Sequence, residues 1–295
     1  MGGCMTTLPD KFAAVLILLL SLHAGLARSD EADRALAAAL SAETNHEFAA
    51  VEWRRLALRS GAGESSGYSW AAAYEYFRAN RHDAAVRMLD RAEESSTNLT
   101  AAALLLRADS ALERKDFQGA DYYLEALSGC PAAADWKNYS SLRAAESRLR
   151  QGRFDEARTA LDAYSPRDER RLAAVEGYVK GHDKSPELGG LLGAVLPGLG
   201  YAYSGEYGNA TRSFVLNGIF IFGMARTARD ESWGAFAGLS FFELAWYTGS
   251  IYGGVDAAYR FNQNRLENAV EDIRGNARFT PDFNAIPVVS LRFTF

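Results

Sequence analysis

The chain has 295 residues, which is enough for two domains, and 48% of them are hydrophobic while 23% are charged. A formal net charge of −5 excludes the strongly basic class of nucleic-acid-binding proteins, so we expect no nucleic acid among its partners. Of its two cysteines, Cys4 and Cys130, only the second lies outside a predicted leader, which excludes an intrachain disulfide framework. No Cys/His cluster predicts a metal site, and we expect neither a metal nor another cofactor.

Residues 1–27 are predicted to be a signal peptide that directs export. The apolar run Phe12–Leu22 follows Lys11 and is shorter than the roughly 20 residues that a membrane-spanning helix needs. Gly25–Ala27 then supplies small residues at the positions that a signal peptidase reads. The alternative is an uncleaved anchor in the same place, and both interpretations direct the chain to a membrane of the cell envelope.

Residues 28–180 contain four units that share one layout. They start at intervals of 36, 35 and 37 residues, at His46, His82, Phe117 and Phe154. The third residue after each start is a small one that lets two helices approach closely: Ala49, Ala85, Ala120 and Ala157. Larger apolar residues follow at offsets 7 and 10 on the same helical face, so each unit predicts one packed helix.

Each unit after the first is preceded by a second helical stretch and a turn. These stretches are Trp70–Arg78, Leu99–Glu113 and Tyr139–Leu149. Two helices at a period near 34 residues resemble tetratricopeptide repeats, and the resemblance covers about Ala32 to Val179. It implies a solenoid of helical hairpins whose concave groove binds proteins or peptides rather than catalysing a reaction.

The histidines have two interpretations. His46 and His82 occupy the repeat position that Phe117 and Phe154 hold later, so imidazole rings are expected to fill an aromatic packing site. The alternative is a metal-binding or pH-sensing pair. No histidine, carboxylate pair or nucleophile assembles into a catalytic set, and we expect a protein that is not an enzyme.

After a polar linker at 181–187, residues 188–257 are predicted to form a small helical membrane domain. Charge almost vanishes from its three segments, which are Leu188–Ser204, Ser213–Ala225 and Trp233–Val255. Glycines at small-residue spacing are expected to let these helices touch in lipid: Gly189, Gly193, Gly200, Gly249 and Gly253. The alternative is a buried helical domain of a globular protein.

The first of these segments contains a hairpin motif. It consists of Pro197, Gly198, Gly200, Tyr203 and Gly205. This string resembles the PGxGxxYxG motif of bacterial membrane domains akin to the TM2 family, with Tyr201 where those domains often have Gln. Because proline breaks a helix and glycine permits a tight turn, the backbone is expected to bend there.

Two polar residues lie within the apolar segments. Glu243 and Asn217 form the candidate intramembrane polar site, since an ionisable group at that depth is a functional candidate by default. The alternative is that Glu243 is hydrogen-bonded to Asn217 or to a tyrosine hydroxyl and only holds helices together.

The tail comprises residues 258–295. An amphipathic helix is predicted over Asp256–Ile273 and leads into it, with Tyr259, Leu266, Val270 and Ile273 near one face. Val289–Phe295 alternates with the period of a short strand. If all three membrane segments cross, the tail lies opposite the repeats, whereas a re-entrant first segment keeps it on the exported side. Both topologies remain open from the sequence.

Together these features predict an all-α protein with a tetratricopeptide-like solenoid, a small transmembrane helical domain and a short terminal strand. We expect an adaptor in a membrane of the bacterial envelope, with the repeats on the exported, periplasmic side. Its expected partners are envelope proteins or peptides bound in the repeat groove, and the lipid bilayer. The alternative function is membrane transport or membrane-protein insertion that uses Glu243.

Overall fold

The structure is a computed structural model that describes residues 31–95, 100–130 and 133–275. Every regular element in these ranges is a helix, which confirms the all-α prediction. The chain divides into two compact units, 31–147 and 148–275, and each is described by itself. The predicted signal peptide at 1–27 and the predicted strand Val289–Phe295 lie outside the described residues.

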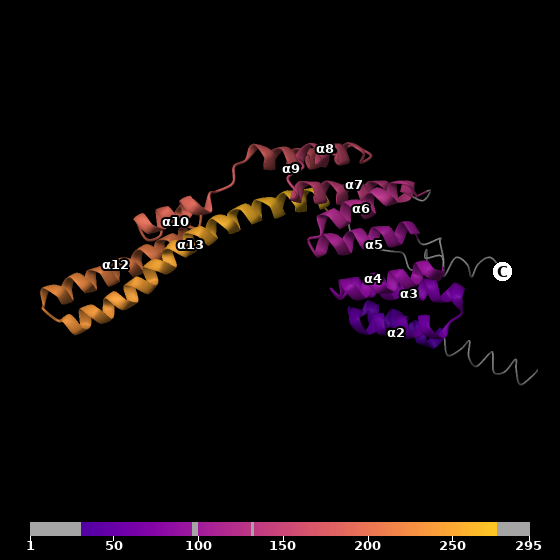
Figure 1. The fold of residues 1–295 in the computed structure, drawn as a ribbon, viewed down its shortest axis with the longest axis horizontal. Helices are drawn as coiled ribbons and strands as arrows, with labels where there is room; N and C mark the ends of the chain where they lie inside the picture. Colours follow the sequence, from indigo (N-terminus) through magenta and orange to yellow (C-terminus); the bar gives the residue numbers. More distant parts are fainter. Residues whose placement is uncertain (1–30, 96–99, 131–132, 276–295) are drawn as a thin grey trace, which may run out of the picture. The chain divides into compact units, whose positions relative to one another are not determined.

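The first unit is a series of helical hairpins (Figure 1). A helix at residues 31–42 comes first, and its successors are α2 (His46–Arg59), α3 (Ala62–Arg78), α4 (His82–Ser95), α5 (Thr100–Glu113), α6 (Phe117–Ser128) and α7 (Ala133–Arg150). Consecutive helices from α2 to α6 pack against one another. The predicted repeat starts at His46, His82 and Phe117 are the first residues of α2, α4 and α6, so the repeat-like helical architecture is confirmed.

The same turn precedes each of these helices. The residue two positions before the helix has a positive φ, which is 62° at Thr44, 60° at Asn80 and 62° at Lys115. The next residue returns its N–H to the carbonyl five positions back, as in Arg81 to Tyr76 at 2.8 Å. This is the Schellman arrangement, which satisfies the last carbonyl groups of the preceding helix. Because the same turn recurs before each helix, the sequence period predicts the first residue of each helix correctly.

The small residues of the repeat lie where the helices touch. Ala49, Ala85 and Ala120 are all 0% exposed. Around them the core is built from larger side chains that are also fully or almost fully buried, among them Trp70, Leu89 and Leu106. Because an alanine brings two helix backbones close, each hairpin buries its apolar faces against its neighbours.

The two repeat histidines have different partners. His82 packs edge-on against Phe77 with ring centroids 5.5 Å apart, and burial lowers the pKa of its imidazole, as an aromatic packing site requires. His46 instead hydrogen-bonds through Nδ1 to the Glu75 carboxylate at 2.8 Å. Each imidazole ring therefore contacts a side chain of α3, His46 from α2 and His82 from α4.

The second unit contains the fourth predicted repeat and then helices that do not follow the repeat pattern. Its helices are α8 (Phe154–Asp162), α9 (Glu169–Lys180), α10 (Pro186–Val195), α11 (Leu199–Tyr203), α12 (Tyr207–Arg229) and α13 (Trp233–Arg274). The fourth repeat start, Phe154, is again the first residue of a helix, and Ala157 is 0% exposed. Gly152 has a φ of 74° in the preceding turn.

The partner of α9 is the distant second half of α13. Arg171 at the start of α9 donates to the carbonyl of Ile273, and Arg265 donates to the carbonyl of Tyr178 at 2.6 Å. These pairings make the two helices antiparallel, like the hairpins of the repeats. The segment 186–255 is thus an insertion between the two helices of a closing hairpin.

The predicted amphipathic helix is part of α13 rather than a separate element, since α13 runs for 42 residues without a break. Val270 and Ile273 are buried as predicted, at 1% and 0% exposure. Tyr259 is 59% exposed, so its assignment to the apolar face was wrong. The buried positions at that level are Ala257 and Ala258, because close helix packing there admits only small side chains.

The predicted first membrane segment, Leu188–Ser204, is not a single helix. It divides into α10 and α11 around Pro197, and the Ser185 N–H donates to the Tyr203 hydroxyl at 3.1 Å. The start of α10 and the end of α11 therefore lie together, and the segment reverses direction. The other two predicted segments lie in α12 and α13, which form an antiparallel hairpin (Figure 1). The prediction of transmembrane helices needs correction in one respect: no helix of the described ranges combines the length and the apolar composition that crossing a bilayer requires.

Candidate functional site

Three helices of the second unit meet at three glycines. A Cβ atom on Gly200 of α11 would lie 2.2 Å from the carbonyl oxygen of Gly189 in α10. A Cβ on Gly254 of α13 would lie 2.5 Å from the same oxygen and 3.0 Å from the Gly200 Cα. Only glycine therefore allows α10, α11 and α13 to approach this closely.

Of the five glycines predicted to lie at helix contacts, some do and some do not. Gly193 packs on α13, where an added Cβ would lie 3.0 Å from the Ser250 carbonyl oxygen, and Gly253 faces the Tyr201 ring. Gly249 faces open space, so the prediction that it packs was wrong. Gly254 was missed, because the sequence alone does not show which of two adjacent glycines faces the neighbouring helix.

The residues of the hairpin motif lie together at the reversal between α10 and α12. Pro197 is buried in the turn, and Gly198 has a φ of 96° with its N–H donated to the Ser250 Oγ at 3.0 Å. Gly205 has a φ of 83° in the turn before α12. Positive φ values at both glycines explain why the motif needs these residue types.

The turn into α12 is another copy of the repeat turn. The Glu206 N–H donates to the Tyr201 carbonyl at 2.9 Å, the same five-residue return as in the repeats. Gly205, Tyr207 and Ala210 stand at the spacing that Gly152, Phe154 and Ala157 show in the fourth repeat. The start of α12 was therefore predictable from the same spacing, although the repeat prediction ended at residue 180.

A line of buried polar groups runs between α12 and α13. Ser213 Oγ donates to Ser250 Oγ at 2.9 Å, and the Asn217 amide donates to the Ser213 carbonyl at 2.7 Å. Asn217 is 2% exposed, and its Oδ1 accepts no hydrogen bond from the described residues. The two serines were not predicted, because a serine within an apolar helix commonly bonds its own backbone.

Glu243 lies on the buried side of α13 at 7% exposure, and neither carboxylate oxygen has a hydrogen-bond partner among the described residues. The alternative in which Asn217 or a tyrosine hydroxyl binds it is therefore wrong for this arrangement. Ser213 opposite Ser250 and Gly223 opposite Leu239 set the antiparallel register, which separates Asn217 and Glu243 by about one helical turn. Three acceptor oxygens without donors thus face the interior of one hairpin, an arrangement suited to a proton or a cation.

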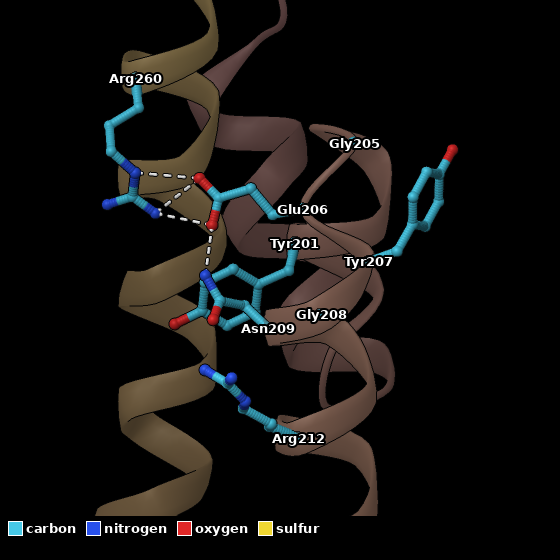
Figure 2. A pocket seen from close by; sticks show the side chains of 8 residues that line it. All are labelled: Tyr201, Gly205, Glu206, Tyr207, Gly208, Asn209, Arg212 and Arg260. Carbon is cyan, nitrogen blue, oxygen red and sulfur yellow. Dashed lines mark hydrogen bonds and ion pairs between the residues drawn. The ribbon is translucent and has the colours of Figure 1, made fainter.

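A cavity of about 740 Å³ lies beside the start of α12, lined by Tyr201, Gly205, Glu206, Tyr207, Gly208, Asn209, Arg212 and Arg260. Figure 2 shows Arg260 reaching from α13 to Glu206, with Nη2 and an oxygen 2.8 Å apart. The Asn209 amide donates to the same carboxylate at 2.6 Å. The Tyr207 ring extends to the side away from α13, while the Arg212 guanidinium turns towards α13 below the Tyr201 ring. The cavity lining therefore contains two cations: Arg260, which is paired with Glu206, and Arg212.

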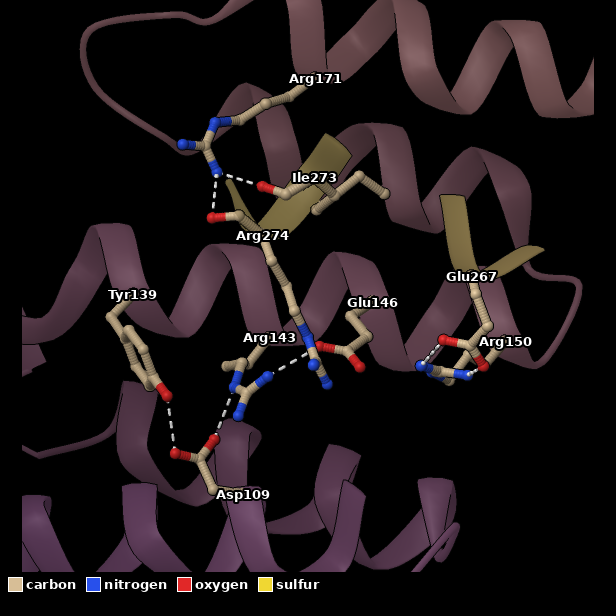
Figure 3. A network of polar contacts seen from close by, with 9 residues as sticks. All are labelled: Asp109, Tyr139, Arg143, Glu146, Arg150, Arg171, Glu267, Ile273 and Arg274. Carbon is tan, nitrogen blue, oxygen red and sulfur yellow. Dashed lines mark hydrogen bonds and ion pairs between the residues drawn. The ribbon is translucent and has the colours of Figure 1, made fainter. Parts of the chain in front are cut away.

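The first unit contains a buried ionic network, drawn in Figure 3. Asp109, 1% exposed, accepts hydrogen bonds from the Tyr139 hydroxyl and from Arg143 Nε, both at 2.7 Å. Arg143 also donates to Glu146 at 2.9 Å. Burial opposes the Arg143 cation, but Asp109, Tyr139 and Glu146 more than offset this and raise its pKa. Since Arg143 and Tyr139 of α7 both bind the Asp109 carboxylate of α5, the network stabilises packing between these two helices.

A second set of polar contacts in Figure 3 joins α13 to the start of the second unit. Arg150 binds Glu267 through two bonds of 2.7 and 2.8 Å, and Arg171 donates to the last carbonyls of α13. Cations at a helix C-terminus are favourable, because they satisfy unpaired carbonyls and oppose the helix dipole. These contacts were not predicted, because they join residues more than a hundred positions apart.

Comparison with known proteins finds no family model, no curated protein and no solved structure that matches this chain. What is established is the all-helical, repeat-like architecture, which is compatible with a tetratricopeptide-like solenoid. The proposed function therefore rests on the geometry and exposed surfaces of the two units rather than on kinship.

Proposed function

We propose that this protein is a membrane-anchored adaptor of the bacterial cell envelope, with helical repeats that bind protein partners and an α12–α13 hairpin embedded in lipid. One observation carries the proposal. Along the hairpin, large apolar side chains each at least 39% exposed cover the outer surfaces: Phe214, Val215, Leu216, Ile219, Ile221, Phe222, Phe241, Phe242, Leu244, Trp246 and Tyr252. Exposed apolar side chains in this number on one hairpin are typical of a membrane or protein interface.

The distribution of charge along the hairpin supports lipid as its surroundings. Arg212 and Arg260 lie at one end, and Arg226, Arg229 and Asp230 lie at the other. Between them, 213–225 of α12 carries no charge and 233–255 of α13 carries only the inward-facing Glu243. At 1.5 Å per residue the uncharged part of α12 is roughly 20 Å long, against about 30 Å of hydrocarbon. Arginines that extend to the headgroups and a locally thinner bilayer accommodate such a difference.

The reversal in α10 and α11 favours the topology with a re-entrant first segment. Ser185 and Tyr203 meet at the end of the α12–α13 hairpin where Arg260 binds Glu206, so α10, α11 and α12 all begin or end at one level. In this proposal α13 returns from the membrane to the side occupied by α9. With export directed by the predicted signal peptide, that side is the periplasmic one. The TM2-like identity of the insertion and the tetratricopeptide identity of the repeats belong to this same proposal.

The adaptor role rests on the repeat surface. On α2, Phe48, Val51 and Leu58 are 67%, 48% and 56% exposed, at offsets of 3 and 10 that place them on one helical face. Exposed apolar side chains of this kind supply the buried centre of a protein interface. We expect partner proteins or peptides to contact the repeats, including this face.

Photo-crosslinking of the full chain tests the adaptor role. A benzophenone amino acid at Phe48 or Val51 is expected to give discrete adducts with envelope proteins in native membranes, because those side chains face outward. The same group at Glu125, an exposed polar position on α6, is the matched control. Adducts of equal pattern and yield at all three positions would contradict a specific surface.

A second function, transport or membrane-protein insertion, is favoured by the unpartnered Glu243 carboxyl. Since Glu243→Gln removes no hydrogen bond, we expect the free energy of unfolding to change by less than about 1 kcal/mol. In proteoliposomes that report internal pH, the wild type is then expected to carry protons or cations and E243Q to be inactive. Wild-type vesicles no leakier than protein-free ones would reject transport, and a strongly destabilised E243Q would indicate a purely structural carboxyl.

A further inference from the structure

Among the charged groups around the cavity of Figure 2, Arg212 is distinctive. Glu206 accepts from Arg260 at 2.9 and 3.0 Å and from Asn209 at 2.6 Å, so its charge is already neutralised. Arg260 binds Asp256 as well. Arg212 forms no hydrogen bond or ion pair with the described residues. Arg260 is therefore neutralised by two carboxylates, whereas the guanidinium of Arg212, the second cation in the lining, has no carboxylate partner among the described residues.

Other hydrogen-bond donors belong to residues that line the same cavity. The start of α12 has no side-chain cap, so N–H groups of its first turn remain available for an acceptor. The Tyr201 hydroxyl points to α13, where it lies against Gly253. A helix N-terminus beside an unpaired arginine and a hydroxyl is chemically suited to a phosphate group.

An apolar track leads away from Arg212 along α12. Val215, Leu216, Ile219 and Phe222 follow it at offsets of 3, 4, 7 and 10, the spacing of one helical face, and they are 48%, 39%, 60% and 74% exposed. The cation thus lies at the polar end of a continuous apolar stripe. A ligand that matches both features has an anionic head and a hydrocarbon chain.

We propose that this cavity binds the headgroup of an anionic phospholipid, with Arg212 on the phosphate and an acyl chain along the Val215–Phe222 face. A headgroup of net negative charge is favoured over a zwitterionic one, because the guanidinium of Arg212 has no carboxylate partner and repels the positive group of a zwitterionic headgroup. The inference rests on the proposed membrane anchoring and adds to it a specific lipid class. It predicts a selective site rather than general attraction to a charged surface.

The test uses the full chain in a neutral detergent, with bound lipid counted by native mass spectrometry as phosphatidylglycerol or phosphatidylcholine is titrated. The wild type is expected to prefer phosphatidylglycerol, and Arg212→Gln to weaken that binding by about tenfold or more, the loss expected for one charge-assisted contact. Arg229→Gln, at the far end of the same helix, is the matched control and is expected to bind like the wild type. Because the Arg212 side chain forms no hydrogen bond or ion pair with the described residues, circular dichroism of R212Q is expected to match the wild type.

Three outcomes would overturn the inference. Equal weakening in R212Q and R229Q would indicate nonspecific attraction, and equal binding of the two lipids by the wild type would remove the selectivity. Competition by inorganic phosphate alone, at the affinity of the lipid, would identify a site for soluble anions instead. Flotation with pure phosphatidylcholine vesicles separates this inference from the anchoring proposal. A chain that fails to float refutes anchoring, whereas a chain that floats without lipid selectivity refutes only the headgroup site.

Discussion

Replacing Asp109 with Leu is expected to destabilise the repeat unit by about 3 to 5 kcal/mol, the range seen when a buried ion pair loses one partner. The Asp109 carboxylate accepts from both Tyr139 and Arg143, whose side chain is only 10% exposed. Without it, Arg143 loses one of its two carboxylate partners and the Tyr139 hydroxyl loses the bond that it donates to Asp109. Because the Arg143 cation cannot reach water without separating α5 from α7, the loss extends to the packing of both helices.

Urea denaturation followed by circular dichroism measures this effect as a shift in the midpoint. Asp83→Ala is the matched control in the same unit, since Asp83 pairs with Arg114 through a carboxylate that is 77% exposed. A surface pair of this kind contributes about 1 kcal/mol or less. If D109L were no more destabilising than D83A, the network of Figure 3 would be incidental to stability.

Replacing Gly254 with Ala is expected to destabilise the second unit by about 1 to 3 kcal/mol, the usual cost of overpacking a well-filled contact. The new methyl group would lie 2.5 Å from the Gly189 carbonyl oxygen and 3.0 Å from the Gly200 Cα. Both neighbours are backbone atoms, so the clash is relieved only if α10 and α11 move away from α13. Loss of this contact would also remove the packing that holds the turn at Pro197, between α10 and α11, against α13.

Gly249→Ala is the matched control on the same helix, because nothing lies within 4 Å of a Cβ built there. Alanine is favoured over glycine within a helix by roughly 0.5 to 1 kcal/mol, so G249A is expected to be neutral or stabilising. The two variants are compared by their thermal unfolding midpoints in detergent and by their rates of proteolysis at the turn between α10 and α11. A lower midpoint and faster cleavage are expected for G254A only. Identical behaviour of G254A and G249A would contradict the three-helix crossing.

The repeat architecture was largely predictable, because its signals are local. An aromatic or histidine residue followed three positions later by alanine marks the start of α2, α4, α6 and α8, and one type of turn links that pattern to the backbone. The residues Pro197, Gly198 and Gly205 were likewise sufficient to predict a reversal. Local chemistry of this kind can be recognised directly in a sequence.

The features that were missed depend on contacts between distant positions. The pairing of α9 with the end of α13 joins Arg171 to Ile273, and no sequence spacing indicates it. The buried charges of α5 and α7 look like an exposed polar face until their neighbours are known. Glu243 was identified from its apolar surroundings, but its lack of a partner among the described residues follows only from the packing of α12 against α13.

Collision accessibility of spin labels tests the lipid-embedded hairpin most directly. Nitroxide groups are placed at Ile219, Phe222 or Phe242 in full-length protein in phosphatidylcholine vesicles, with Cys4 and Cys130 replaced by serine. A label at Tyr122, 68% exposed on α6, is the aqueous reference. We predict that the three hairpin labels are relaxed strongly by oxygen and weakly by a water-soluble nickel complex, and that the reference label shows the reverse. Nickel access at the hairpin equal to that at Tyr122 would contradict a lipid environment and, with it, the anchored adaptor.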